Sequence, residues 1–347
     1  MSESGTLSAL IGEANFRLRW FDLGRRLRPV PRSTVEAFEE GRAPWPFPYL
    51  RHAWAGLLLW PEEGGEPVVW FLRLPLDEQG KLQLPIRDAF LRLIEQKLRQ
   101  GDPSESASQL HTALEESGLL FSPATEGQAC FHARAALLLQ RPASAHYASA
   151  LAYLREPQSQ RWDQLAIQGI ADLAAHWEEE RELLLQRIPD LAPPVFISLS
   201  QCLENEAIDH RLAGAIIARA DSELRSESAD FTLIGAAVRG VSHSAARGLR
   251  LQFLQRILQA PAGHNGEVLA AIGSRCAYDL ESAELAAPWL AALAQNQGQD
   301  TFNLLLIDLM FLPQVRASLL SALRDPARPE VLAKAFGNFL RGPEEPH

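Results

Sequence analysis

The sequence has few cysteines and no apolar run long enough to cross a membrane as a helix. Cys130, Cys202 and Cys276 are its three cysteines, and they are far apart in 347 residues. This spacing excludes a CxxC redox pair and a compact metal knuckle. A membrane-spanning helix needs about 20 apolar residues, and the apolar run near the N-terminus is broken by Gly12 and Glu13. We therefore expect a cytoplasmic protein with no membrane span and no secretory signal.

Known catalytic and ligand-binding motifs are also missing. The sequence contains no phosphate-binding GxxxxGK[ST] loop, no GxGxxG, no GxSxG, no HExxH and no calcium-binding EF-hand loop. Ser242, His243 and Ser244 place hydroxyls beside an imidazole, but adjacent residues of a helix do not face each other. The nine histidines are dispersed without the paired spacing of metal ligands. We predict no catalytic residue, no cofactor and no metal.

The charge is acidic overall but contains two basic groups. Lys and Arg number 33 against 43 Asp and Glu, a net charge of −10, which argues against a protein built to coat nucleic acid or an anionic membrane. Six arginines and a single acid lie between positions 17 and 32, and four arginines and no acid lie between positions 239 and 256. The candidate partner-binding residues in these groups are Arg25, Arg26, Arg28, Arg239, Arg247 and Arg250.

Each basic group has a less specific explanation. The first group is either a docking patch for acidic segments or phosphates, or a solvated face or a clamp onto the protein's own acids. The second group either lines a groove or forms internal salt bridges. A groove of this kind binds a protein partner with an acidic or amphipathic segment, or the phosphates of a nucleic acid. The acidic flanks, Glu178–Glu180 and residues 221–230, favour the protein partner.

The first hundred residues predict a small α+β domain. Residues 15–22 alternate apolar and basic side chains, and 52–60 and 68–74 are apolar runs separated by a glycine-containing turn. This pattern predicts an antiparallel β-hairpin or sheet, covered by helices at about 4–12, 33–40 and 86–99. The many aromatic residues here form either the domain core or a stacking surface for a ligand. Asp77 and Glu78 form either a turn or a pair of acids with a chemical role.

From residue 102 onward the pattern is helical. Helices are expected at about 104–117, 126–140 and 144–155, followed by paired helices whose first members register at 164, 198, 231, 267 and 302. Near-constant spacing is typical of stacked helix pairs, although an irregular helical domain would also give such spacings by chance. We predict a mainly α-helical, HEAT-like, right-handed stack. The expected domains are 1–101 (aromatic-rich α+β), 102–157 (connecting helices) and 158–347 (helical repeat).

Three motifs resemble those of an uncharacterised bacterial family defined as a domain of unknown function. They are DLGRR at 22–26, WFLRLPLDEQG at 70–80 and QGIAD at 168–172. The resemblance spans nearly the whole chain and implies a full-length member. It implies no activity, cofactor or site residue.

Taken with the repeat pattern, the missing motifs favour a non-enzymatic protein–protein interaction or scaffold protein of unknown pathway. The alternatives are a nucleic-acid-binding helical-repeat protein and an enzyme whose residues converge only in three dimensions.

Overall fold

The chain forms two compact units, Met1–Ala124 and Thr125–His347. The computed structural model describes residues 5–13, 15–62, 65–100, 115–156 and 161–341. The boundary at Ala124 differs from the expected boundaries at 101 and 157. The predicted helix at 104–117 falls mostly outside the described residues.

The first unit is built on a four-stranded antiparallel sheet with the strand order β2-β1-β3-β4. The predicted hairpin is present as its last two strands. The elements of this unit are α1 (Leu7–Glu13), β1 (Phe16–Asp22), β2 (Arg28–Pro29), α2 (Arg32–Glu39), β3 (His52–Pro61), β4 (Val68–Pro75) and α3 (Leu84–Gln100). Strand β2 was not predicted, because two residues are too few to show the alternation that marks a strand.

Aromatic side chains fill the core of this unit. Trp20, Phe38, Trp45 and Trp70 are buried in one apolar cluster with residues of all three helices, and the rings of Phe38 and Trp45 lie 4.9 Å apart. Burial of such large side chains is a major stabilising contribution in a small domain. The Asp77 carboxylate accepts hydrogen bonds from the backbone N–H groups of Gln79 (2.8 Å) and Lys81 (2.9 Å), so it stabilises a turn.

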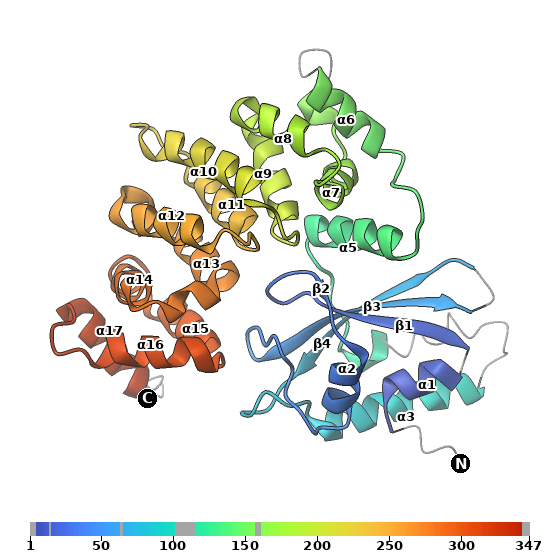
Figure 1. Cartoon of the computed structure of the whole chain (residues 1–347). Coiled ribbons are helices and arrows are strands. Elements are labelled where there is room, and N and C mark those ends of the chain that lie inside the picture. Colours follow the sequence, from blue (N-terminus) through green and yellow to red (C-terminus); the bar gives the residue numbers. More distant parts are fainter. Residues whose placement is uncertain (1–4, 14, 63–64, 101–114, 157–160, 342–347) are drawn as a thin grey trace. The chain divides into compact units, whose positions relative to one another are not determined.

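The second unit consists of helices arranged in two rows (Figure 1). In the first row each helix contacts the next: α5 (Thr125–Leu138), α7 (Ile167–Ala175), α9 (Pro193–Leu203), α11 (Phe231–Val241), α13 (Gly266–Arg275) and α15 (Gln299–Met310). The second row contains α6 (Tyr147–Arg155), α8 (Arg181–Arg187), α10 (His210–Leu224), α12 (Arg247–Gln259), α14 (Ala283–Asn296) and α16 (Pro313–Arg324). The last helix, α17 (Glu330–Arg341), packs against α14, α15 and α16.

The predicted helix pairs after position 158 are therefore present: positions 198, 231, 267 and 302 lie within α9, α11, α13 and α15, and position 164 lies three residues before α7. Helices α5 and α6, which the sequence suggested were a connection, contact α7 and α8 and extend both rows. The sequence did not assign these helices to the repeat, because α5 begins at Thr125 and α7 at Ile167. This distance of 42 residues is longer than the spacing of the later helix pairs. Within the described residues, no helix is both long and apolar enough to span a membrane.

Candidate functional site: the two arginine groups

The first arginine group is engaged largely within its own unit. Arg25 is buried and donates a hydrogen bond from Nε to the Pro48 carbonyl oxygen (3.1 Å), and its guanidinium lies 5.4 Å from the centre of the Tyr49 ring. The guanidinium of Arg28 lies 3.4 Å from the centre of the Phe47 ring. These contacts hold Arg25 and Arg28 against residues 47–49. The clamp interpretation requires in addition a contact with an acid of the chain itself.

The acid that this arginine group contacts is Asp22. It is fully buried, accepts hydrogen bonds from Trp45 Nε1 (3.2 Å) and the Gly24 backbone N–H (3.4 Å), and ion-pairs with Arg28 at 3.5 Å. Burial raises its pKa to about 6, and Arg28, Trp45, Gly24 and Arg25 offset part of that increase. Arg26 in the same segment is partly buried. A docking role for Arg25, Arg26 and Arg28 stays a prediction.

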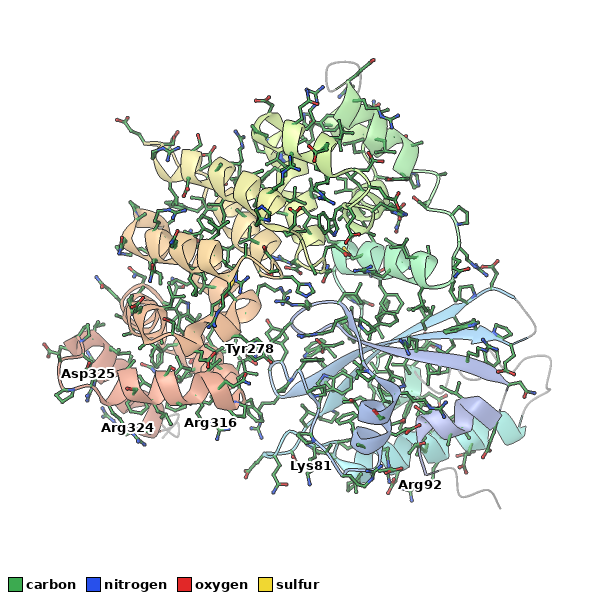
Figure 2. The ribbon with its side chains drawn as sticks, viewed as in Figure 1. Lys81, Arg92, Tyr278, Arg316, Arg324 and Asp325 are labelled. Carbon is green, nitrogen blue, oxygen red and sulfur yellow. The ribbon has the colours of Figure 1, made fainter. Side chains whose placement is uncertain are left out.

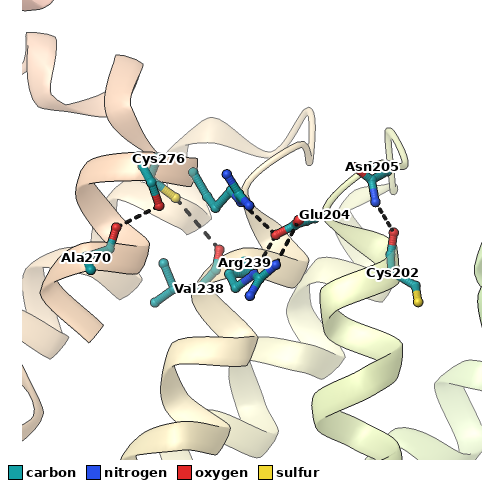
Figure 3. A network of polar contacts seen from close by, with 9 residues as sticks. Cys202, Glu204, Asn205, Val238, Arg239, Ala270 and Cys276 are labelled. Carbon is teal, nitrogen blue, oxygen red and sulfur yellow. Dashed lines mark hydrogen bonds and ion pairs between the residues drawn. The ribbon is translucent and has the colours of Figure 1, made fainter. Parts of the chain in front are cut away.

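In the second group, Arg239 belongs to an ion-pair network around the buried carboxylate of Glu204. Its Nε and terminal nitrogen donate to both carboxylate oxygens of Glu204, at 2.6 and 3.0 Å. Arg275 donates from Nε to the same carboxylate at 3.0 Å. Figure 3 shows the carboxylate held between the two guanidinium groups. Burial alone would raise the pKa of Glu204, but Arg275 and Arg239 lower it below its usual value.

Arg250 and Arg247 lie on α12, the second helix of the pair that α11 begins, and they meet another acid. Arg250 makes two hydrogen bonds to Asp279, at 2.6 and 2.9 Å, and a third to the Ser244 carbonyl oxygen at 2.6 Å. Arg247 lies 3.7 Å from both Asp279 and Glu281, and its side chain is 55% exposed. Of Arg239, Arg247 and Arg250, Arg247 therefore has the most accessible side chain.

Polar contacts between neighbouring helix pairs recur at two sequence separations. Three of them join residues 35 positions apart and three join residues 29 positions apart. The first set is Arg239–Glu204, Thr232–Glu267 and Arg256–Asp221, and the second is Arg211–Glu182, Arg250–Asp279 and Gln255–Glu284. Two fixed separations are expected when equivalent positions of stacked repeats face each other. Most arginines of the second group thus serve the stacking of the repeats.

The QGIAD motif joins the first helices of the second unit. Gln168 Nε2 donates to the Ala129 carbonyl oxygen of α5 and to Asp172 Oδ1, both at 3.2 Å. Asp172 Oδ2 accepts from the backbone N–H (3.1 Å) and the hydroxyl (2.5 Å) of Ser144, just before α6. The motif therefore positions α5, α6 and α7 relative to one another.

Gly169 of the same motif allows a close backbone approach. A Cβ atom at this position would lie 2.5 Å from the His146 carbonyl oxygen, which is too short for any side chain without movement of the backbone. The rings of Tyr147, which follows His146, and His176 stack with their centroids 5.0 Å apart. Burial, together with Glu180 and Glu179, raises the pKa of Tyr147 to about 12.

The sequence did not predict an exposed apolar surface on α15. Leu304 and Ile307 of α15 are 53% and 39% exposed, whereas Leu305, Leu306 and Leu309 of the same helix are buried. Hydrophobic residues occur around most of this helix, so periodicity alone does not separate its exposed side from its buried side.

Two further exposed residues, Arg316 and Arg324, lie on α16 and were not among the candidate residues predicted from the sequence (Figure 2).

The titratable residues of the second unit include one carboxyl with an unusual environment. Burial raises the pKa of Glu206 to about 7, and Arg134, which bonds to it, opposes the increase. Cys130, Cys202 and Cys276 are buried free thiols. Within the described ranges, no three His, Cys, Asp or Glu side chains are grouped so that they could hold a metal ion.

Comparison with known proteins gives one match. The model of a family described as "Protein of unknown function (DUF3549)" matches residues 2–340. This confirms the resemblance to an uncharacterised family that spans nearly the whole chain. No curated protein and no solved structure matches the sequence.

Proposed function

We propose that this chain, which belongs to the DUF3549 family of proteins of unknown function, is a non-enzymatic interaction or scaffold protein that binds an amphipathic segment of a protein partner. The observation that carries the proposal is an apolar stripe on α15, formed by the exposed Leu304 and Ile307 and continued by the partly buried Phe311. Helical stacks commonly use an extended row of helices for recognition.

The stripe has the geometry of a helix-binding surface. Its residues are spaced i, i+3 and i+7, so they lie on one side of α15. Leu304 and Ile307 are exposed, and Phe311 directly after the helix is partly buried. An amphipathic helix that lays its apolar face on this stripe would remove these side chains from water.

The charges favour an amphipathic partner over a purely acidic one. The guanidinium groups of Arg239 and Arg250 already bind Glu204 and Asp279, so an acidic segment would have to displace carboxylates of the chain itself. Arg247 is more exposed and is the residue of this group best placed to contact an acidic side chain at the edge of a partner. The nucleic-acid alternative relied on the arginines between positions 17 and 32 as well as on this group, and it stays an alternative.

A cytoplasmic location is part of this proposal. Its support is that the three cysteines are free thiols, a state that suits a reducing compartment.

Site-specific crosslinking of the full chain tests the proposal. A photoreactive amino acid is placed at position 304 or 307 of α15, and as a matched control at Leu249, a 42% exposed leucine of α12. We expect both α15 positions to crosslink the same cellular protein through a peptide with amphipathic helical periodicity, and the control position not to do so. The purified partner should then bind the full chain, and L304E/I307E should weaken that binding while L249E does not. Absence of an adduct at 304 and 307, or the same adduct at 249, would overturn the proposal.

A further inference from the structure

The last helix carries a second apolar stripe on a flank beside the face that packs on the stack. Helix α17 packs on its neighbours through the buried Leu332 and Ala335. Beside this buried face, four apolar residues recur at i, i+3, i+4 and i+7, which places them on one flank of the helix: Ala333, Phe336, Gly337 and Leu340. Leu340 is 69% exposed, the largest value among the exposed large hydrophobic side chains of the described residues.

We infer that this flank binds the same flank of a second copy of the chain, so that two α17 helices pair in an antiparallel, two-fold symmetric dimer. A two-fold interface needs a surface that is complementary to itself. The stripe meets this condition, because in one antiparallel register Phe336 lies opposite Gly337 of the second copy and Leu340 lies opposite its Ala333. Phe336 and Leu340 of each copy then pack against Gly337 and Ala333 of the other copy.

The small residues have room for these contacts. A Cβ atom added to Gly337 would approach only the guanidinium of Arg341, at 3.8 Å. The ring of Phe336 is oriented by the Phe339 ring, which stacks on it with a centroid distance of 6.2 Å. The Arg341 guanidinium bonds to the Gly337 carbonyl oxygen (3.3 Å) and to Asn338 Oδ1 (3.2 Å), so this flexible side chain has to move from Gly337 when Phe336 of the second copy packs there.

The charges at the ends of α17 favour the same arrangement. Glu330 lies in the first turn and Arg341 in the last turn, so antiparallel pairing brings the acidic end of each helix towards the basic end of the other. In the register above, Arg341 lies opposite position 332, about 3 Å along the axis from Glu330 of the second copy. Both side chains are exposed and long enough to meet. Antiparallel helices also place opposite ends of their dipoles together.

The test is sedimentation velocity of the full chain from about 1 to 100 μM, a range that spans micromolar dimerisation. The wild type should form a dimer that dissociates on dilution. Leu340→Glu should weaken dimerisation by about tenfold or more. Val331→Glu should not, because Val331 is an exposed apolar residue on the other side of the buried face. Circular dichroism checks that each variant is folded.

A charge exchange distinguishes this helix pairing from any other dimer. Glu330→Arg and Arg341→Glu should each weaken self-association, because each places like charges together at both ends. An equimolar mixture of the two variants should form a heterodimer more strongly than either variant forms a homodimer. A wild type that stays monomeric throughout the range would overturn the inference. A dimer unaffected by Leu340→Glu, or a mixture that associates no better than its components, would do the same.

Discussion

Arg239 and Glu204 lie 35 residues apart in the sequence and are joined by two hydrogen bonds between α11 and the end of α9, at 2.6 and 3.0 Å. Arg275 of the next first-row helix shares the same carboxylate. The buried carboxylate of Glu204 thus links three successive helices of the first row, α9, α11 and α13. A residue that the sequence suggests is a docking residue is, in the structure, part of the connection between repeats.

Removing the shared carboxylate should strongly destabilise the second unit. Glu204→Gln removes the buried carboxylate that two guanidinium groups share, so we expect a loss of about 3–5 kcal/mol in the free energy of unfolding. Glu182→Gln is the matched control: Glu182 also pairs with an arginine, Arg211, but both side chains are exposed, and exposed pairs contribute about 0–1 kcal/mol. Urea unfolding of the full chain measures both, and equal effects would contradict the importance of burial.

Two glycines of the second unit should respond in opposite ways to alanine. Gly169→Ala forces a Cβ atom to within 2.5 Å of the His146 carbonyl oxygen, so we expect a loss of about 1–3 kcal/mol from overpacking. Gly214→Ala, within α10, meets nothing within 4 Å and should stabilise by up to about 1 kcal/mol, because alanine favours the helix. Thermal unfolding compares them. A neutral Gly169→Ala would show that the approach of α7 to His146 is not tight.

The buried Asp22 predicts a pH dependence. Its folded pKa of about 6 lies above the ordinary value of 3.8, so the folded state holds the proton more tightly than the unfolded state. Stability from this group is complete below pH 4 and is lost as the pH rises through 6, about 3 kcal/mol in all. Asp22→Asn keeps an oxygen acceptor for Trp45 and should remove this dependence.

The measurement is tryptophan fluorescence during urea unfolding, repeated between pH 4 and 7. The difference between wild type and Asp22→Asn isolates this group from Glu39 and Glu206, whose pKa values are also raised by burial. Parallel pH profiles for the two proteins would show that Asp22 is not the source.

Truncation tests where the second unit begins. A fragment of residues 125–347 should unfold cooperatively, since it retains every helix of both rows. A fragment of 158–347 lacks α5 and α6, so it loses the partners of Gln168 and Asp172 and uncovers α7. We expect it to melt at a lower temperature by circular dichroism. Equal melting temperatures would favour the boundary near 157.

Sequence periodicity predicted the fold well where local signals were strong. The hairpin from β3 to β4 was found from two apolar runs around a glycine turn, and the helix pairs after 158 from their spacing. Strand β2 was missed because it is very short and is defined by pairing with β1 rather than by its own residues. The membership of α5 and α6 was missed because their spacing departs from the repeat.

The functional residues were harder to predict, because their roles depend on distant partners. The sequence shows Arg239 and Arg250 as a basic group, but not that carboxylates 35 and 29 positions away occupy them. Likewise, Leu304 and Leu305 are equivalent in a hydropathy pattern, and packing alone exposes one and buries the other. Ion pairing across repeats and helix orientation are tertiary properties.

Hydrogen–deuterium exchange of the full chain with its crosslinked and purified partner tests the proposed recognition surface most directly. We predict slower amide exchange on complex formation in peptides covering residues 299–311, with no change in those covering α12. Protection confined to other segments, or no protection of α15 at saturating partner, would contradict the claim that the stripe of Leu304, Ile307 and Phe311 binds the partner.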